Sequence, residues 1–340
     1  MAGPLVSVIV PVFNRQSLIA DAVGSLVRQT VQDIEIIVVD DGSSDGSADV
    51  AERAGDDRVR IVGHGRNCGI PAARNSGLEA ACGRYVAWLD SDDVAHPQRL
   101  ERQLQFLERH PEIALAGSAA GRITAQGRRR LGARVPFRSH ETLCASLLFR
   151  SPFQQSSIIG RADVLKAYEY RAEYPVCEDL DMFIRVSRDH RVANLGQALV
   201  DRRVHNGQIG RSEGAAVREC KKRLLAPLLE ELGIELSDVD LERHVDLGTP
   251  KKAQPSAQDL WWTEQWLRKL KESNARAGRY DGAALATVCA RNLLASGLAA
   301  INRRNALPVA AALLGSSVTA GMLSPDFVDW LAWLGAGLFG

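Results

Sequence analysis

Three carboxylates within four positions end an apolar run in the N-terminal third of the chain. Residues 85–89 are apolar, and Asp90, Ser91, Asp92 and Asp93 follow them directly. Carboxylates this close repel one another, so a divalent cation or solvent must absorb their charge. Oxygen ligands suit Mg²⁺ and Mn²⁺, and such a cation would stabilise negative charge on a phosphate. The run predicts a metal-dependent phosphate site at the end of a strand.

A second acidic group, Glu178, Asp179 and Asp181, precedes a run of apolar residues at helical spacing. Carboxylates in the first turn of a helix interact favourably with its dipole, so a purely structural role is one interpretation. Residues two apart do not share a helix face, so we expect Asp181 to point away from Asp179.

Composition excludes several classes of protein. The chain has 340 residues, a formal charge of +1 and 46% hydrophobic residues, enough for one large or two modest domains. The near-neutral charge and scattered arginines argue against nucleic-acid binding. Six cysteines lack zinc-ligand spacing, and residues 1–4 lead into a strand-like segment without a signal-peptide pattern. We expect a reduced, cytoplasmic setting.

Residues 5–118 alternate short apolar runs with amphipathic segments, which indicates strand–helix–strand units around a parallel sheet. Strands are predicted over 6–12, 34–39, 59–62 and 85–89, and each ends in a polar or acidic loop. Ligands bind beyond the carboxyl ends of strands in such sheets, so these loops should converge on one site.

The connecting segments carry helix signals. Apolar residues at helical spacing over 18–27 predict a first helix, with Asn14 or Ser17 available as its N-cap. Pro71 suits the first turn of a helix reaching residue 81. Pro97 should open another helix, whose apolar face comprises Leu100, Leu104 and Leu107.

Some acidic residues have structural interpretations as well. Asp40 and Asp41 follow the second strand in an Asp-Gly-Ser loop, and such loops commonly initiate turns. Asp93 could cap the helix that begins near Pro97 instead of serving the metal site.

Four segments now carry a resemblance to a family. Residues 7–14 (SVIVPVFN), 38–45 (VVDDGSSD), 67–77 (NCGIPAARNSG) and 89–93 (LDSDD) resemble, in order and spacing, motifs of the family-2 inverting glycosyltransferases with the GT-A fold. The resemblance covers roughly residues 5–210 and implies an α/β fold: a Rossmann-like, mostly parallel central sheet flanked by helices. It further implies a catalytic domain over 1–213, with a nucleotide-sugar half at 5–118 and an acceptor half at 119–213.

The resemblance also implies roles in the donor site. Pro11, Phe13 and Asn14 would line the nucleotide, Asp41 would accept a hydrogen bond from the base, and Arg74 would face the nucleotide.

Asp90 and Asp92 match the family's Asp-x-Asp motif. With Ser91 between them, they would contact the donor, and Asp92 and Asp90 would hold Mn²⁺ or Mg²⁺. His205, in an Arg-x-His-like segment, could join the metal or phosphate, and residues 205–214 are rich in Gly and Ser, as in a lid that orders on donor binding.

In the family, a Glu-Asp pair after the metal motif supplies the general base. The match is Glu178 with Asp179, and Asp179 is the predicted base. It would take the proton of the acceptor hydroxyl while that oxygen attacks the anomeric carbon. Helix capping remains the alternative for Asp179.

The other segments are less specific. Residues 119–150 are locally basic, which fits either a solvated hairpin or contact with a phosphate-bearing acceptor or anionic membrane. Residues 214–340 read as a helical extension for packing, homo-oligomerisation or membrane association. Its apolar stripe includes Leu260, Trp261, Trp262, Trp266, Leu267 and Leu270. The uncharged stretch 305–325 is diluted by Gly, Ser and Thr, which argues against a membrane span.

The sequence therefore predicts an inverting, metal-dependent glycosyltransferase. It would move a sugar from a nucleotide donor, UDP-linked by expectation, to a saccharide or lipid-linked saccharide in surface-polysaccharide assembly. A peripheral position at the inner face of the cytoplasmic membrane is compatible with this role. The alternative is a catalytically inactive nucleotide-sugar-binding scaffold of the same fold. No Gly-rich loop follows the first strand, which argues against a nucleotidyltransferase or a dinucleotide oxidoreductase.

Overall fold

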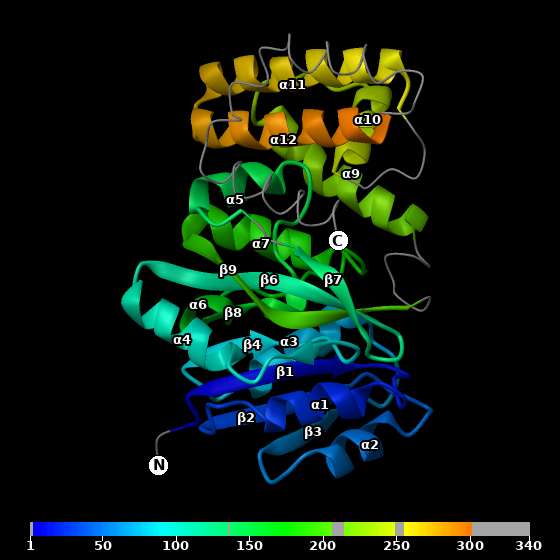
Figure 1. Ribbon diagram of the computed structural model, residues 1–340, viewed down its shortest axis with the longest axis vertical. Coiled ribbons are helices and arrows are strands. Elements are labelled where there is room, and N and C mark those ends of the chain that lie inside the picture. Colours follow the sequence, from blue (N-terminus) through cyan, green and yellow to red (C-terminus); the bar gives the residue numbers. More distant parts are fainter. Residues whose placement is uncertain (1–2, 135–136, 206–213, 249–254, 301–340) are drawn as a thin grey trace. The chain divides into compact units, whose positions relative to one another are not determined.

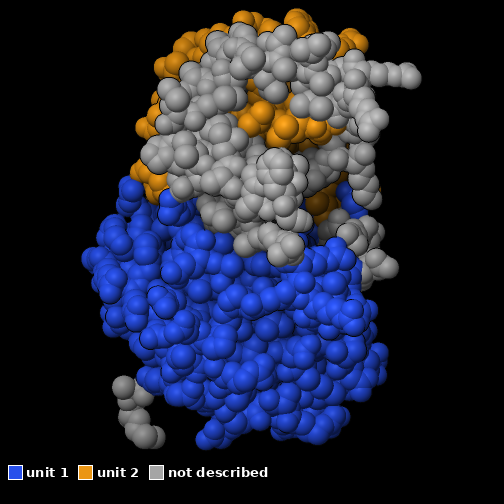
Figure 2. All heavy atoms as spheres, viewed as in Figure 1, with its two compact units in different colours: residues 1–138, 153–214, 333–340 blue, residues 139–152, 215–332 orange. Residues whose placement is uncertain are grey.

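A computed structural model of the chain describes residues 3–134, 137–205, 214–248 and 255–300. The described residues form two compact units, shown in different colours in Figure 2. Among the described residues, unit 1 comprises 3–134, 137–138, 153–205 and 214, and unit 2 comprises 139–152, 215–248 and 255–300. The sequence placed residues 139–152 in the acceptor half, whereas the structure assigns them to the helical unit 2.

The N-terminal half of unit 1 is a parallel sheet (Figure 1). Its strands, in the spatial order β3–β2–β1–β4, are β1 (Val6–Val12), β2 (Ile34–Asp40), β3 (Val59–Gly63) and β4 (Tyr85–Trp88). The intervening helices are α1 (Ile19–Val27), α2 (Ser47–Ala54) and α3 (Ile70–Ala80). The expected strand–helix alternation is confirmed here.

The sheet continues with mixed pairing. The further strands are β5 (Val94–Ala95), β6 (Ile113–Thr124), β7 (Arg129–Arg134), β8 (Ile159–Arg161) and β9 (Arg191–Val204). β8 runs antiparallel to both β4 and β6, β6 and β9 are parallel, and β5 and β7 pair antiparallel with β9 and β6. The sheet is therefore mixed, and the expected parallel arrangement is limited to its first half and the β6–β9 pair.

The described part of unit 1 has four further elements. They are α4 (Arg99–Arg109), the 3₁₀ turn η1 (Gln155–Ser157), α6 (Ala162–Leu165) and α7 (Glu178–Asp189). The helix expected near Pro97 is α4, and its apolar face, Leu100, Leu104 and Leu107, is buried as predicted.

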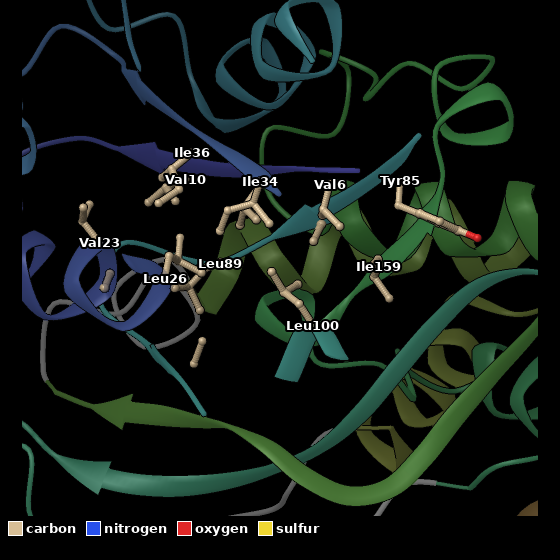
Figure 3. Close-up of a cluster of buried hydrophobic side chains, with 14 of the residues drawn as sticks. Val6, Val10, Val23, Leu26, Ile34, Ile36, Tyr85, Leu89, Leu100 and Ile159 are labelled. Carbon is tan, nitrogen blue, oxygen red and sulfur yellow. The ribbon is translucent and has the colours of Figure 1, made fainter. Parts of the chain in front are cut away.

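The core of unit 1 lies between this sheet and its helices (Figure 3). Val8, Val10, Ile36 and Val38 are fully buried, because helices cover both faces of the parallel strands. The predicted face of α1 is buried, but its predicted cap is wrong: Leu18 occupies the N-cap position, with no side-chain cap hydrogen bond. The side chain of Asn14 binds a neighbouring loop instead, as described below.

Unit 2 is helical. Its helices are α5 (His140–Leu147), α9 (Gly214–Glu230), α10 (Asp238–Leu247), α11 (Ala257–Ala277) and α12 (Gly282–Ala300). Ser256 and Asp259 form a reciprocal capping box at the start of α11. Trp266 and Leu267 of the predicted apolar stripe are buried, whereas Trp261 is 64% exposed.

One described segment, Gly282–Ala299, is long and apolar enough to cross a membrane, and half of it is buried within the protein. A buried core helix passes the same test, so this observation is weak evidence for a span. The uncharged stretch 305–325 and most of the expected lid, residues 206–213, lie outside the described residues.

Candidate functional site

The loops after β1 and β2 are tied together at the carboxyl edge of the sheet. Asn14 adopts a left-handed backbone conformation, with φ of 51°. Its Oδ1 accepts a hydrogen bond of 2.9 Å from the Ser44 amide, and its own amide donates to Ser43 Oγ at 3.0 Å. Phe13 beside it is 40% exposed. An exposed aromatic ring next to a fixed polar loop is suited to contact a planar ligand.

Asp40 and Asp41 have different roles despite their adjacency. Asp40 Oδ1 accepts the Ser43 amide at 3.0 Å, so Asp40 is the turn-forming residue of the two. Asp41 is 4% exposed and binds the loop that precedes α3. It accepts hydrogen bonds of 2.9 Å from the amides of Cys68 and Gly69.

His64, at the end of β3, completes the surroundings of Asp41. Its Nδ1 lies 2.7 Å from Asp41 Oδ1, and its Nε2 lies 2.9 Å from Ser76 Oγ. Because a carboxylate only accepts, Nδ1 carries the proton, and in the neutral ring Nε2 accepts from Ser76. Sequence reasoning missed His64, since nothing local indicates that it reaches Asp41.

The structure brings Asp92 and His205 together across 113 positions of sequence. His205 Nε2 lies 2.7 Å from Asp92 Oδ2. The pairing of β5 with the end of β9 places Val94 opposite Asp201, which carries the segment holding His205 past the acidic loop. Asp90, the other member of the motif, is one third exposed at its side chain.

Negative charge accumulates at this acidic loop. Burial raises the pKa of Asp90, and the neighbouring Asp92 acts in the same direction against the opposing charge of Arg74. Burial also raises the pKa of Asp93 well above its usual range, with Asp92 and Asp90 adding to the effect. The protein's own cations therefore do not fully compensate the loop, which is the electrostatic setting of a cation site.

Asp93 does not cap α4, whose N-cap position is held by Gln98. Its two oxygens instead accept from Ser156 Oγ at 2.5 Å and from the Arg203 amide at 2.9 Å. Ser156 Oγ in turn accepts the Asp90 amide at 3.2 Å. The buried Asp93 thus joins the acidic loop to η1 and to β9.

Arg203 clamps the same loop from the other side. This residue is 2% exposed, and its Nε donates to the Asp92 carbonyl at 2.8 Å. Its Nη1 donates to the Ala125 carbonyl at 2.9 Å, and its Nη2 to Asp21 Oδ2 at 2.7 Å. Sequence analysis predicted a site role for His205 but not for Arg203. The only local signal for Arg203 was its place in the Arg-x-His segment.

Arg74 connects the two acidic groups of the site. It lies on α3, is 4% exposed, and its Nη2 is 3.3 Å from both Asp90 Oδ1 and Glu178 Oε1. The guanidinium also lies over the Tyr170 ring, 5.4 Å from its centroid. Burial opposes its charge, yet Glu178 and Asp90 hold the pKa of Arg74 above its usual value.

Glu178 and Asp179 occupy the first turn of α7 but differ in environment. Glu178 is buried, which raises its pKa to about 7, although Arg74 opposes the shift. Asp179 is half-buried, and its Oδ1 accepts the Leu180 amide at 2.8 Å. Asp181 points elsewhere, as expected, and pairs with Arg185 at 2.7 Å. Asp179 is thus the more accessible of the two first-turn carboxylates.

Comparison with known proteins decides the family. The family model described as "Glycosyl transferase family 2" matches residues 7–166. The putative glycosyltransferase EpsE of Bacillus subtilis is 32% identical over 206 residues, which span 58% of this chain and 72% of EpsE. This chain is a member of glycosyltransferase family 2.

Two further similarities support the assignment of this family-2 glycosyltransferase. The amylovoran biosynthesis glycosyltransferase AmsE of Erwinia amylovora is 31% identical over 214 residues, which cover 61% of this chain and 79% of AmsE. The crystal structure of S. aureus TarS 1–349 in complex with UDP-GlcNAc superposes with a TM-score of 0.55 at 19% identity, covering 87% of this chain and 90% of that one. The structural likeness confirms the GT-A type of fold expected from the sequence.

The matched family region contains only part of the side-chain cluster described above. It includes Asp41, Arg74, Asp90 and Asp92, but it ends before α7 and before His205. The tertiary structure supplies the connection, because Arg74 and Asp92 lie inside the matched region and contact Glu178 and His205 outside it.

Proposed function

We propose that the protein is an inverting, metal-dependent glycosyltransferase that uses a nucleotide-sugar donor, most specifically a UDP-sugar. One observation carries the proposal: the guanidinium of Arg74 pairs with Asp90 of the metal motif and with Glu178 beside the predicted base, at 3.3 Å each. In this proposal the donor diphosphate and the acceptor hydroxyl meet beside these groups. The arrangement supports single-displacement transfer, with a cation on one side and a carboxylate base on the other.

The side chains at the acidic loop are suitable ligands for Mn²⁺ or Mg²⁺. Asp92, Asp90 and His205 offer carboxylate oxygens and an imidazole nitrogen. Burial raises the pKa of Asp90, and the charge of the neighbouring Asp92 adds to the rise against the opposing charge of Arg74. The bound cation would stabilise the charge that develops on the departing diphosphate. Asp93 and Arg203 hold the loop that carries these residues, and His205, now 2.7 Å from Asp92, would offer its imidazole nitrogen to the cation.

Arg74 is suited to act on the donor as well as on the two carboxylates. Among the described residues, no hydrogen-bond partner lies at its buried Nε and Nη1 atoms. Buried donors without acceptors are costly, so an anionic ligand that supplies acceptors would stabilise this arrangement. This supports the expected proximity of Arg74 to the nucleotide.

Asp179 is the proposed general base and Glu178 its neighbour that holds Arg74. A base must reach the acceptor hydroxyl, and the half-buried Asp179 is accessible where Glu178 is not. Glu178, with a pKa raised to about 7 by burial, adds less negative charge near neutral pH than an ordinary carboxylate would.

Pro11, Phe13, Asn14 and Asp41 form the proposed nucleotide end of the site, with Ser91 beside the donor phosphates. The choice of UDP is supported by the UDP-GlcNAc complex of TarS, a protein with the same fold. The acceptor is proposed to be a hydroxyl of a saccharide or lipid-linked saccharide, because AmsE is named for the biosynthesis of a polysaccharide. A lipid-linked acceptor would place the enzyme at the inner face of the cytoplasmic membrane.

Calorimetric titration with UDP, GDP and dTDP, each with Mn²⁺ and with EDTA, tests the donor site. We expect UDP to bind with Mn²⁺ and to bind much more weakly with EDTA. Asp92→Ala should abolish this metal dependence, whereas Asp49→Ala, an exposed carboxylate on α2, should preserve it. Equal UDP affinity with and without Mn²⁺ in wild type would contradict a metal-dependent site.

Turnover distinguishes an enzyme from a scaffold. Incubation with a panel of UDP-sugars and mass spectrometry of released UDP detects slow donor hydrolysis or transfer to added saccharides. Metal-dependent UDP release that is lost in Asp179→Asn supports catalysis. Metal-dependent binding with no release across the panel would favour the nucleotide-sugar-binding scaffold.

A further inference from the structure

Asp41, which is proposed to bind the nucleotide base, lies beside two other side chains that can bind metal ions. One atom each from Asp41, His64 and Cys68 lies within 4.8 Å of the others. They come from the ends of β2 and β3 and from the loop before α3, and Asp41 is buried, His64 half-buried and Cys68 exposed. None of these side chains belongs to the acidic loop at Asp90 and Asp92.

We propose that Asp41, His64 and Cys68 form a second metal site, selective for a thiophilic divalent cation such as Zn²⁺. Carboxylate oxygen, imidazole nitrogen and thiolate sulfur are all ligands of Zn²⁺, whereas the sulfur disfavours Mg²⁺ and Mn²⁺. A water molecule would take the fourth position of the tetrahedron. The proposed cation is therefore chemically distinct from the one that serves the acidic loop.

Only small side-chain movements are needed. Metal–ligand lengths of about 2.0–2.3 Å place the ligand atoms of a tetrahedron roughly 3.3–3.6 Å apart. Asp41 and His64 must separate slightly from their present 2.7 Å, and the exposed Cys68 side chain must turn inward from its contact of 3.4 Å with the Arg66 carbonyl. The Cys68 amide already donates to Asp41, which fixes the start of that side chain near the site.

The surroundings of the ligands suit both the metal-free and the metal-bound state. In the metal-free state His64 Nδ1 donates to Asp41 and Nε2 accepts from Ser76. On binding, the ring proton moves to Nε2 and is donated to Ser76 Oγ, because a hydroxyl can donate or accept. Cys68 loses its thiol proton, so one proton is released per cation. The amides of Cys68 and Gly69 continue to hold Asp41.

Occupancy of this site would oppose donor binding, a consequence that rests on the proposed role of Asp41 in the nucleotide site. A cation bound to Asp41 would compete with a nucleotide-base N–H for this carboxylate. Zn²⁺ bound at Asp41 should therefore weaken nucleotide binding, whereas Mn²⁺ bound at the acidic loop should strengthen it.

Cadmium titration of the reduced full-length protein tests the site directly, since a Cd²⁺–thiolate bond absorbs in the ultraviolet. We expect a band that saturates at one Cd²⁺ per chain and is displaced by Zn²⁺. Cys68→Ser should abolish it, and Ser76→Ala should weaken Cd²⁺ binding by about 10- to 100-fold through loss of the imidazole partner. Cys82→Ser, which alters another exposed cysteine, should leave the band unchanged.

A band that persists in Cys68→Ser, or the absence of any saturable band in wild type, would overturn the proposal. The same titration does not depend on glycosyl transfer. If wild type binds Cd²⁺ through Cys68 but binds no UDP with Mn²⁺, the proposed function fails and the metal site stands. If UDP binds and Zn²⁺ weakens it equally in wild type and Cys68→Ser, the inhibitory role of the site fails.

Discussion

The two units bury polar side chains in opposite ways. Unit 1 buries ionisable groups against one another around Arg74, Glu178 and Asp93, and the pKa values of both acids are raised by that burial. Unit 2 buries His244 with its Nε2 donating to the Leu148 carbonyl at 2.7 Å and its Nδ1 accepting from Trp266 at 2.9 Å. The first arrangement keeps charge in excess, and the second keeps the ring neutral with both nitrogens bonded.

This difference is the one expected between a functional site and a region whose role is structural. Uncompensated buried charge destabilises a fold, and it persists where binding or catalysis needs it. A fully hydrogen-bonded neutral group costs little and specifies one packing arrangement. We therefore expect substitutions in the charge cluster of unit 1 to change function more than stability, and those around His244 to change stability alone.

Asp179→Asn should give the largest effect on function. Removing the proposed base should lower transfer by about 10²- to 10⁴-fold, while metal-dependent UDP binding and thermal stability stay near wild type. Asp189→Asn, an exposed change at the other end of α7, is the control and should keep activity. Retained turnover in Asp179→Asn would reassign the base, with Glu178 the next candidate.

His244 should make unit 2 sensitive to acid. Burial lowers its pKa from 6.5 to about 4, so between these values the unfolded chain binds a proton that the folded chain does not. Stability from this group is fully present above pH 6.5 and is lost as the pH falls to 4, by about 3 kcal/mol at most.

Denaturant unfolding at pH 7, 5 and 4, followed by tryptophan fluorescence, measures this loss. His244→Gln should be less stable at pH 7 but show a shallower decline with acid, and the exposed His110→Gln should decline as wild type does. Equal pH dependence in all three proteins would refute the assignment.

Arg203→Lys tests whether metal-dependent binding at the acidic loop depends on the contacts of Arg203. Lysine keeps the charge but cannot reach the Asp92 carbonyl, the Ala125 carbonyl and Asp21 together. We expect UDP affinity with Mn²⁺ to fall by about 10- to 100-fold, with little change in EDTA. The exposed neighbour Arg202→Lys should behave as wild type, and an equal loss in Mn²⁺ and EDTA would indicate a general folding defect instead.

The smallest effect should come from an exposed ion pair in unit 2. Lys222 Nζ lies 2.7 Å from Glu242 Oε1 on the surface of the helices. Because solvent screens such pairs, Lys222→Met should leave the unfolding midpoint of unit 2 unchanged. A clear shift would show that surface charge, and not only the His244 arrangement, stabilises this unit.

Local patterns were sufficient for most elements of the N-terminal half of unit 1. The apolar strand runs, the buried face of α1 and the Pro71 start of α3 were all predicted, because side-chain periodicity and backbone restriction act over a few residues. The acidic loop after β4 and the acidic first turn of α7 were visible for the same reason.

The sequence by itself therefore determined the parallel half of the sheet, the two acidic motifs and the family resemblance. Only the tertiary structure decided which side chains meet: Asp92 with His205, Arg74 with Glu178, and His64 with Asp41. It also showed that Asp93 is buried with Arg203 instead of capping α4, and that residues 139–152 belong to the helical unit. Such contacts join residues far apart in the chain, and their partners are set by strand pairing and packing, which no local pattern encodes.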